Sequence, residues 1–167
     1  GPILSLMETM NGRIIAACRR KLSPMLESFE PFAVDHDGVR LQARRAGVGP
    51  ALLLLHGHPQ SMVMWHRVAP ALAKCFTVVL MDLRGYGDSA RPAPDPLHIA
   101  HSKRKMAVDA LAVMAQAGFD RFDVLAHDRG ARVAHRLAAD HPDAVRRLML
   151  LDIAPTLAMY EQTSEAF

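Results

Sequence analysis

Short apolar runs, separated by polar or glycine-rich stretches, divide most of the chain. Apolar runs of this length and continuity are typical of strands buried on both faces of a parallel sheet. The runs of this kind are Ala51–Leu55, Thr77–Met81, Asp123–Ala126 and Leu148–Leu151. Before them, Phe32–Asp35 and Val39–Arg44 flank Asp37-Gly38, a dipeptide that favours a tight hairpin turn. The pattern therefore predicts an antiparallel hairpin followed by buried parallel strands.

Segments with helical spacing of apolar residues lie between these runs. They are Met62–Lys74, Lys103–Ala117 and Gly130–Asp140, the last closed by Pro142. Ala90–Pro96 contains three prolines and is predicted to be a loop. A hairpin followed by alternating strands and helices predicts an α/β protein with a doubly wound, mostly parallel sheet and an antiparallel start.

Composition and charge narrow the class of protein. Half of the 167 residues are apolar and 22% are charged, as in an ordinary globular domain. Residues 1–24 carry a net charge of +3, which equals the charge of the whole chain, so residues 25–167 are neutral overall. Because the globular part carries no excess of basic residues, we do not expect it to bind nucleic acid.

No apolar run is long enough to cross a membrane. The cysteines, Cys18 and Cys75, are isolated, which favours a reducing, cytoplasmic location.

The first 24 residues are set apart from the rest. Gly1-Pro2 resembles the scar of a cleaved tag. The segment 3–24 is rich in arginine and is open to three interpretations: a short amphipathic helix, an organelle-type leader, or translated upstream sequence. We favour the last, because Met25 opens a sequence that looks like a natural start. We therefore expect an N-terminal extension over 1–24 and a domain core over 25–155.

The strongest chemical signal surrounds Asp128. Here a strand, a sharp turn and a helix follow one another, with the small residues Ala126 and Gly130 two positions to either side. This is the pattern of a nucleophile elbow, in which a strained turn lifts the central side chain into the site. Asp128 could instead only cap the helix. Capping does not explain the small residues on both sides or the arginines that follow, so we interpret Asp128 as a nucleophile.

The type of nucleophile indicates the reaction. A carboxylate is poorly suited to acyl transfer but well suited to displace a leaving group from saturated carbon. The product of that step is an alkyl-enzyme ester, which water must hydrolyse with the help of a base. Dehalogenases and epoxide hydrolases both use this chemistry.

The segment His127-Asp128-Arg129-Gly130-Ala131-Arg132 resembles the signature of the haloacetate (fluoroacetate) dehalogenases, which have the α/β-hydrolase fold. Epoxide hydrolases usually have Trp after the nucleophile. The resemblance covers residues 25–167 and includes His56-Gly57-His58-Pro59-Gln60, Met64-Trp65-His66-Arg67-Val68-Ala69-Pro70, Asp82-Leu83-Arg84-Gly85-Tyr86-Gly87-Asp88-Ser89 and Leu151-Asp152-Ile153-Ala154-Pro155-Thr156. Two positions depart from the family: His58 replaces Phe or Trp, and Ala126 replaces glycine.

The resemblance implies a role for each site residue. Asp128 attacks the carbon that bears the halogen, and Arg129 and Arg132 hold the substrate carboxylate. The backbone N–H groups of His58 and Arg129 form the oxyanion hole. Asp152 orients the catalytic histidine. Without the resemblance, Arg132 is equally consistent with a surface ion pair, and Asp152 with a structural aspartate at a strand end.

The same resemblance implies that parts of the enzyme are missing from this chain. The family carries its histidine base after the last strand, beyond a cap domain, and 156–167 would be the linker into that cap. We therefore expect a truncated chain, produced by engineering, proteolysis, a broken gene or a split protein. Alone, it should release at most one halide per chain. It should also associate, either as a homodimer or with the C-terminal part.

No metal or other cofactor is expected. His56 and His58 have a spacing that metals can use, but the sequence offers no third ligand. His56 and His127 are expected to bind the backbone and not to react. The expected partner is a small haloacid. Two other functions stay open: an epoxide hydrolase with the same nucleophile, and a non-catalytic fragment or assembly partner.

Overall fold

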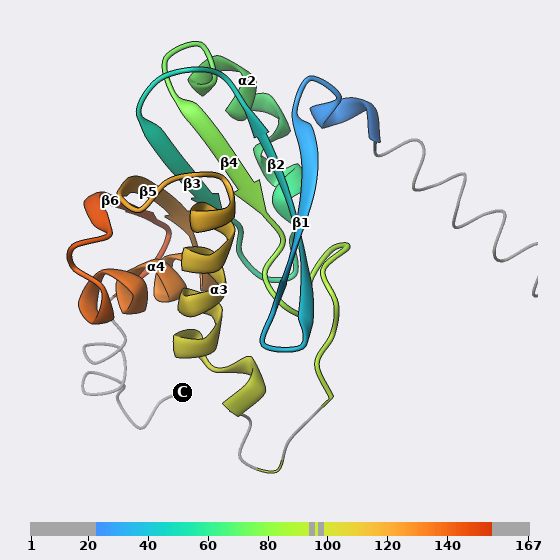
Figure 1. The fold of residues 1–167 in the computed structure, drawn as a ribbon, viewed down its shortest axis with the longest axis vertical. Helices are drawn as coiled ribbons and strands as arrows, with labels where there is room; N and C mark the ends of the chain where they lie inside the picture. Colours follow the sequence, from blue (N-terminus) through green and yellow to red (C-terminus); the bar gives the residue numbers. More distant parts are fainter. Residues whose placement is uncertain (1–22, 94–95, 97–98, 155–167) are drawn as a thin grey trace, which may run out of the picture.

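The computed structural model describes residues 23–93, 96 and 99–154, in which a six-stranded sheet has the strand order β1-β2-β4-β3-β5-β6 (Figure 1). The strands are β1 Glu30–His36, β2 Val39–Ala46, β3 Ala51–Leu55, β4 Thr77–Met81, β5 Phe122–His127 and β6 Val145–Leu151. The helices are η1 Ser23–Leu26, η2 Met62–Arg67, α2 Ala69–Leu72, η3 Ile99–His101, α3 Lys103–Gln116 and α4 Arg129–Asp140. Residues 1–22 of the expected extension over 1–24, and the expected linker over 156–167, lie outside the described residues.

The pairing of the strands confirms the predicted α/β class. β1 pairs with β2, and β2 with β4, in antiparallel fashion. β4, β3, β5 and β6 then form a parallel sheet, in which Leu53 of β3 lies opposite Val79 and Val124. The hairpin turn is also confirmed, because Asp37 and Gly38 both have positive φ angles, 51° and 71°, as the tightest hairpin turns require.

Alternate residues of the central strands build a core on each face of the sheet. Leu53 and Val79 belong to the core beneath α3 and α4. Their neighbours Leu54 and Leu80 belong to the core that contains Trp65 of η2. All of these side chains are buried, as expected for strands covered on both faces. This burial fixes the strand ends where the candidate site residues lie.

Two predictions about these elements are wrong. The segment Met62–Lys74 is not one helix, because Pro70 lies in its middle and has no N–H to continue the ladder of hydrogen bonds. It divides instead into η2 and α2. The run Leu148–Leu151 is not buried on both faces: it belongs to β6 at the edge of the sheet, where Met149 is 60% exposed. The predicted helices Lys103–Ala117 and Gly130–Asp140 are confirmed as α3 and α4.

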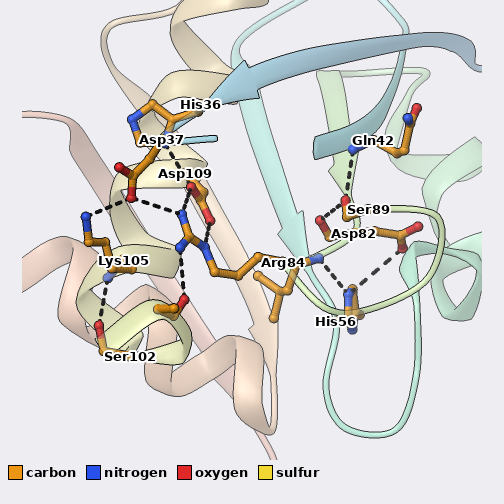
Figure 2. Close-up of polar contacts among 12 residues, drawn as sticks. His36, Asp37, Gln42, His56, Asp82, Arg84, Ser89, Ser102, Lys105 and Asp109 are labelled. Carbon is orange, nitrogen blue, oxygen red and sulfur yellow. Dashed lines mark hydrogen bonds and ion pairs between the residues drawn. The ribbon is translucent and has the colours of Figure 1, made fainter. Parts of the chain in front are cut away.

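A buried ion pair ties the loop after β4 to α3 (Figure 2). Arg84 donates to Asp109 through Nε at 2.5 Å and Nη2 at 2.6 Å, and both side chains are almost completely buried. His36, at the end of β1, lies 2.9 Å from the same carboxylate. One polar contact is therefore shared by three elements: the hairpin, the loop after β4, and α3.

In the described part of the chain, no helix is long and apolar enough to cross a membrane.

We predict that Asp109→Asn destabilises the protein by about 3–5 kcal/mol, because it removes the buried counter-charge of the Arg84 guanidinium and leaves only the half-exposed Asp37 carboxylate, 3.9 Å away. Urea unfolding measures this free energy. Asp35→Asn is the matched control, since Asp35 and its partner Arg40 are both well exposed and such pairs contribute about 0–1 kcal/mol. Equal, small losses in the two variants would show that the buried pair does not stabilise the fold.

Candidate active site

Asp128 lies at the turn between β5 and α4, with φ 48° and ψ −115°. Residues other than glycine rarely adopt such a backbone conformation, which costs about 1–3 kcal/mol and is characteristic of functional sites. The Asp128 side chain makes no capping hydrogen bond to α4. Capping alone therefore does not account for this aspartate, and the backbone has the geometry of a nucleophile elbow.

Two glycines allow the elbow to pack closely against the end of β3. A Cβ atom on Gly130 would lie 2.4 Å from the carbonyl oxygen of His56. A Cβ atom on Gly57 would lie 2.8 Å from the Cβ of Asp128. Both distances are shorter than atoms tolerate, so these positions need glycine. The close packing explains why small residues follow and precede the turn, including the fully buried Ala126.

The Asp128 carboxylate is held by backbone N–H groups. His58 donates its N–H to Asp128 Oδ2 at 2.8 Å. Partial burial raises the pKa of the Asp128 carboxyl, but hydrogen bonds from the backbone N–H groups of His58 and Arg129 lower it, as do the nearby charges of His127 and Arg129. The net pKa lies below the usual value, so Asp128 is an ionised carboxylate near neutral pH.

The buried side chain of His56 anchors the N-terminal end of the loop from Gly57 to Met62, which contains His58. Its Nε2 accepts the N–H of Leu83 at 3.0 Å, so the proton lies on Nδ1, which donates to the carbonyl of Gly57 at 2.8 Å. Burial lowers the pKa of His56, which keeps the ring neutral. The expectation that His56 binds the backbone is confirmed. With both nitrogens occupied, His56 is not available to a metal.

Asp82, whose Oδ1 lies 3.9 Å from Nε2 of His56 (Figure 2), anchors the other end of this loop. Its Oδ1 accepts the N–H of Met62 at 2.7 Å, and its Oδ2 accepts the N–H of Asp88 at 2.9 Å. Burial raises the pKa of Asp82, and these two hydrogen bonds act against that rise. The loop from Gly57 to Met62 is therefore anchored at both ends by buried polar side chains, with the N–H of His58 between them.

Cationic side chains gather beside Asp128. The Arg129 guanidinium lies over the ring of Tyr86, 5.8 Å from its centroid. The Tyr86 hydroxyl lies 3.1 Å from Nδ1 of His58. Burial lowers the pKa of Lys103, at the start of α3, and the positive charges of Arg129 and Arg132 lower it further. Two arginines and a lysine thus create a positive field around one carboxylate.

Asp152 follows directly after β6, at the same end of the sheet as Asp128, and has a φ of 54°. Its Oδ2 lies 3.5 Å from Nε2 of His127. The other ring nitrogen of His127, Nδ1, is buried and has no hydrogen-bond partner in the part of the chain that the structure describes. The expectation that His127 binds the backbone is therefore wrong: its Nδ1 has no partner among the described residues, and its Nε2 lies beside a carboxylate.

The structure brings the predicted site residues together at the carboxyl ends of β3, β5 and β6. Asp128 and Arg129 lie at the elbow, Arg132 one turn further along α4, His58 opposite the elbow, and Asp152 after the next strand. The site also contains Gly57, Tyr86 and Lys103, to which the sequence motifs give no role. The sequence could have indicated Tyr86 and Gly57 as site residues, because both belong to loops that follow predicted strands, where the sites of such sheets lie. Among the residues described, no group of three or more His, Cys, Asp or Glu side chains is placed to hold a metal ion.

Fold and elbow together define the class of protein, and comparison with known families agrees. Residues 50–166 match the family described as "alpha/beta hydrolase fold". The chain therefore belongs to the α/β-hydrolase fold family, and its resemblance to the haloacetate dehalogenases is confirmed by its relatives.

A fluoroacetate dehalogenase from Burkholderia sp. is 51% identical over 138 residues, which are 83% of this chain and 45% of that protein. A soluble epoxide hydrolase from Corynebacterium sp. is 44% identical, over 72% of this chain and 41% of that protein. A solved structure from Nostoc sp. PCC 7120, described as an α/β hydrolase, has a TM-score of 0.80 and 57% identity, with 83% of this chain and 48% of that chain covered. The chain spans less than half the length of these relatives.

We predict that the carboxyl group of Asp128 titrates below pH 3.8, the ordinary value for aspartate. A lowered pKa means that the folded state favours the ionised form, which is present above the lowered pKa and lost only as the pH falls through it. The carbon-13 resonance of this carboxyl, assigned by its loss in Asp128→Asn, reports the midpoint. A midpoint above 3.8 would mean that burial outweighs the backbone hydrogen bonds.

Asp82→Asn should raise that midpoint. Asparagine has a single acceptor oxygen, so the N–H of either Met62 or Asp88 loses its partner and the loop that presents the His58 N–H loosens. The same titration in the variant measures the shift. An unchanged midpoint would show that the His58 N–H stays in place without the Asp82 anchor.

Proposed function

We propose that the protein to which this chain belongs is a hydrolase that displaces halide from haloacetates with Asp128 as nucleophile. The observation that carries this proposal is the ionised carboxylate at a strained elbow, held by the N–H of His58 at 2.8 Å. A carboxylate in this position reacts at saturated carbon, because its oxygen can displace a leaving group and form an ester.

The hydrogen bonds of Asp128 distinguish its two oxygens. Oδ2 accepts the N–H of His58, so we assign the attack to Oδ1. In the first step, Oδ1 forms a bond to the substrate carbon, and the carbon–halogen bond breaks with its electron pair on the halide. Oδ2 then becomes the carbonyl oxygen of the alkyl-enzyme ester. It already accepts the backbone N–H of His58.

The second step hydrolyses the ester. Water adds to the ester carbonyl carbon, and negative charge develops on Oδ2, where the N–H groups of His58 and Arg129 stabilise it. A base takes one proton from the water and returns it to the departing hydroxyacetate oxygen. The second proton of the water remains on the new carboxyl group and passes to solvent, which regenerates the Asp128 carboxylate. We assign the base to the late histidine of the family, with Asp152 orienting it. No metal or organic cofactor takes part in this scheme.

The cations around Asp128 support an anionic substrate. Arg129 and Arg132 can bind a carboxylate with paired hydrogen bonds, and Lys103 adds positive charge from the start of α3. Approach of a haloacetate would relieve the mutual repulsion of the three cations. A neutral substrate gains nothing from this field, so it would react without the benefit of these groups.

An epoxide hydrolase is the second candidate, favoured by the 44% identity to the Corynebacterium enzyme. The same carboxylate could open an epoxide ring. Arg129 argues against it, since epoxide hydrolases usually have Trp at that position and an epoxide offers no carboxylate to an arginine.

We predict that the full-length protein releases halide from haloacetate over many turnovers, and that treatment with a chelator leaves this activity intact. An ion-selective electrode measures the halide. Asp128→Asn should reduce turnover below detection, because the amide is a poor nucleophile. Turnover of an epoxide in the absence of any halide release would support the second candidate and overturn the first.

A further prediction concerns Arg132→Lys. Lysine keeps the charge but loses the bidentate geometry, so KM for haloacetate should rise about tenfold or more, in line with about 1.5–3 kcal/mol for a charge-assisted hydrogen bond. A neutral haloalkane of similar size is the matched control and should react with an almost unchanged kcat/KM. Equal losses on both substrates would mean that Arg132 has a structural role.

A further inference from the structure

His127 occupies an unusual position between two carboxylates. It is the last residue of β5 and precedes Asp128. Its Nδ1 is buried without a partner among the described residues, and its Nε2 lies 3.5 Å from Oδ2 of Asp152. A buried nitrogen without a partner destabilises the folded state, so we expect the other ring nitrogen to make a favourable interaction.

The neighbours of the two ring nitrogens determine which one carries the proton. Nδ1 faces Gly57, where a Cβ atom would lie only 2.9 Å away, and no residue that the structure describes offers it an acceptor. Nε2 faces the Asp152 carboxylate. An unprotonated Nε2 would place its lone pair against a negative charge. We therefore assign the proton to Nε2, whose 3.5 Å contact with Asp152 Oδ2 is longer than a regular hydrogen bond.

Asp152 has little else to orient it within the described residues. Its side chain is 87% exposed, and its backbone has a φ of 54°. The His127 side chain, by contrast, is only 23% exposed and comes from a strand paired on both sides. Of the two side chains in this contact, that of His127 is the more buried and that of Asp152 the more exposed.

We propose that His127 is a positioning residue for Asp152: its Nε2–H fixes Oδ2 of the acid, which leaves Oδ1 directed towards the base that activates water. The inference rests on the proposed function, in which Asp152 orients that base. Because His127 and Asp128 are consecutive, one strand end sets the position of both the nucleophile and the acid. The contact couples the geometry of the two reaction steps without touching the substrate.

This role affects only the second step. Displacement of halide requires Asp128 and the cations, whereas ester hydrolysis requires an oriented acid and base. Loss of the Nε2–H should therefore leave halide release in the first turnover intact and slow the hydrolysis of the ester. A side chain that merely supported the fold would slow both steps alike.

Two variants of the full-length protein test the proposal. In His127→Gln, the side-chain amide nitrogen reaches the place of Nε2 and can donate to Asp152. In His127→Asn, the shorter amide reaches only the place of Nδ1. We expect His127→Asn to keep a burst of one halide per site, to lower steady-state turnover about tenfold or more, and to accumulate the ester on Asp128, as seen by intact mass. His127→Gln should recover most of the turnover.

The outcomes separate this inference from the function on which it rests. If the unaltered protein releases no halide, the proposed function fails and the role of His127 fails with it. If the unaltered protein turns over but His127→Asn slows burst and steady state equally, the positioning role alone is wrong. The same conclusion follows if His127→Gln performs no better than His127→Asn.

Discussion

Asp128 joins β5 to α4 through a backbone conformation, φ 48° and ψ −115°, that an aspartate does not adopt by preference. The surrounding structure holds it there. Its N–H donates to Leu151 O at 3.1 Å, and its carbonyl accepts the N–H of Arg132 at 3.2 Å. Gly57 and Gly130 allow the neighbouring backbone to approach where any side chain would collide. The strain of about 1–3 kcal/mol at such a residue is sustained only by packing of this kind.

The loops that complete the site depend on buried polar groups with complete sets of partners. His56 and Asp82 anchor the two ends of the loop that presents the His58 N–H. On the other side of the loop after β4, Arg84 pairs with Asp109 of α3. Loops of this length would otherwise fluctuate, because they contribute few apolar contacts of their own. The buried hydrogen bonds explain how an N–H from one loop reaches a carboxylate on another at 2.8 Å.

Much of the fold follows from local patterns in the sequence, and some of it does not. The strands were predictable because Leu52–Leu55 and Val78–Met81 are apolar without interruption, and the elbow because its small residues flank one aspartate. The break at Pro70 could have been foreseen from the missing N–H. The exposure of β6 does not follow from the apolar residues within the strand, because burial depends on what packs beside and over that strand.

The contacts within the site depend on tertiary structure. Tyr86 meets His58 and Arg129 only because the loops after β3 and β4 and the start of α4 converge. The link from His127 to Asp152 depends on the pairing of β5 with β6, in which His127 lies opposite Leu151. Neither contact leaves a periodic signal along the chain. Sequence motifs could therefore name the residues with carboxylate and guanidinium groups but not the aromatic and imidazole groups that position them.

The central claim is that Asp128 itself attacks the substrate. The most direct measurement is a single turnover of haloacetate in water labelled with oxygen-18, with enzyme in excess, followed by mass analysis of the peptide that contains Asp128 and of the product. If Asp128 forms the ester and water attacks its carbonyl carbon, the label enters the Asp128 carboxylate and the first product carries unlabelled oxygen. Label in the product and none in Asp128 would show that water attacks the substrate directly and would contradict the account.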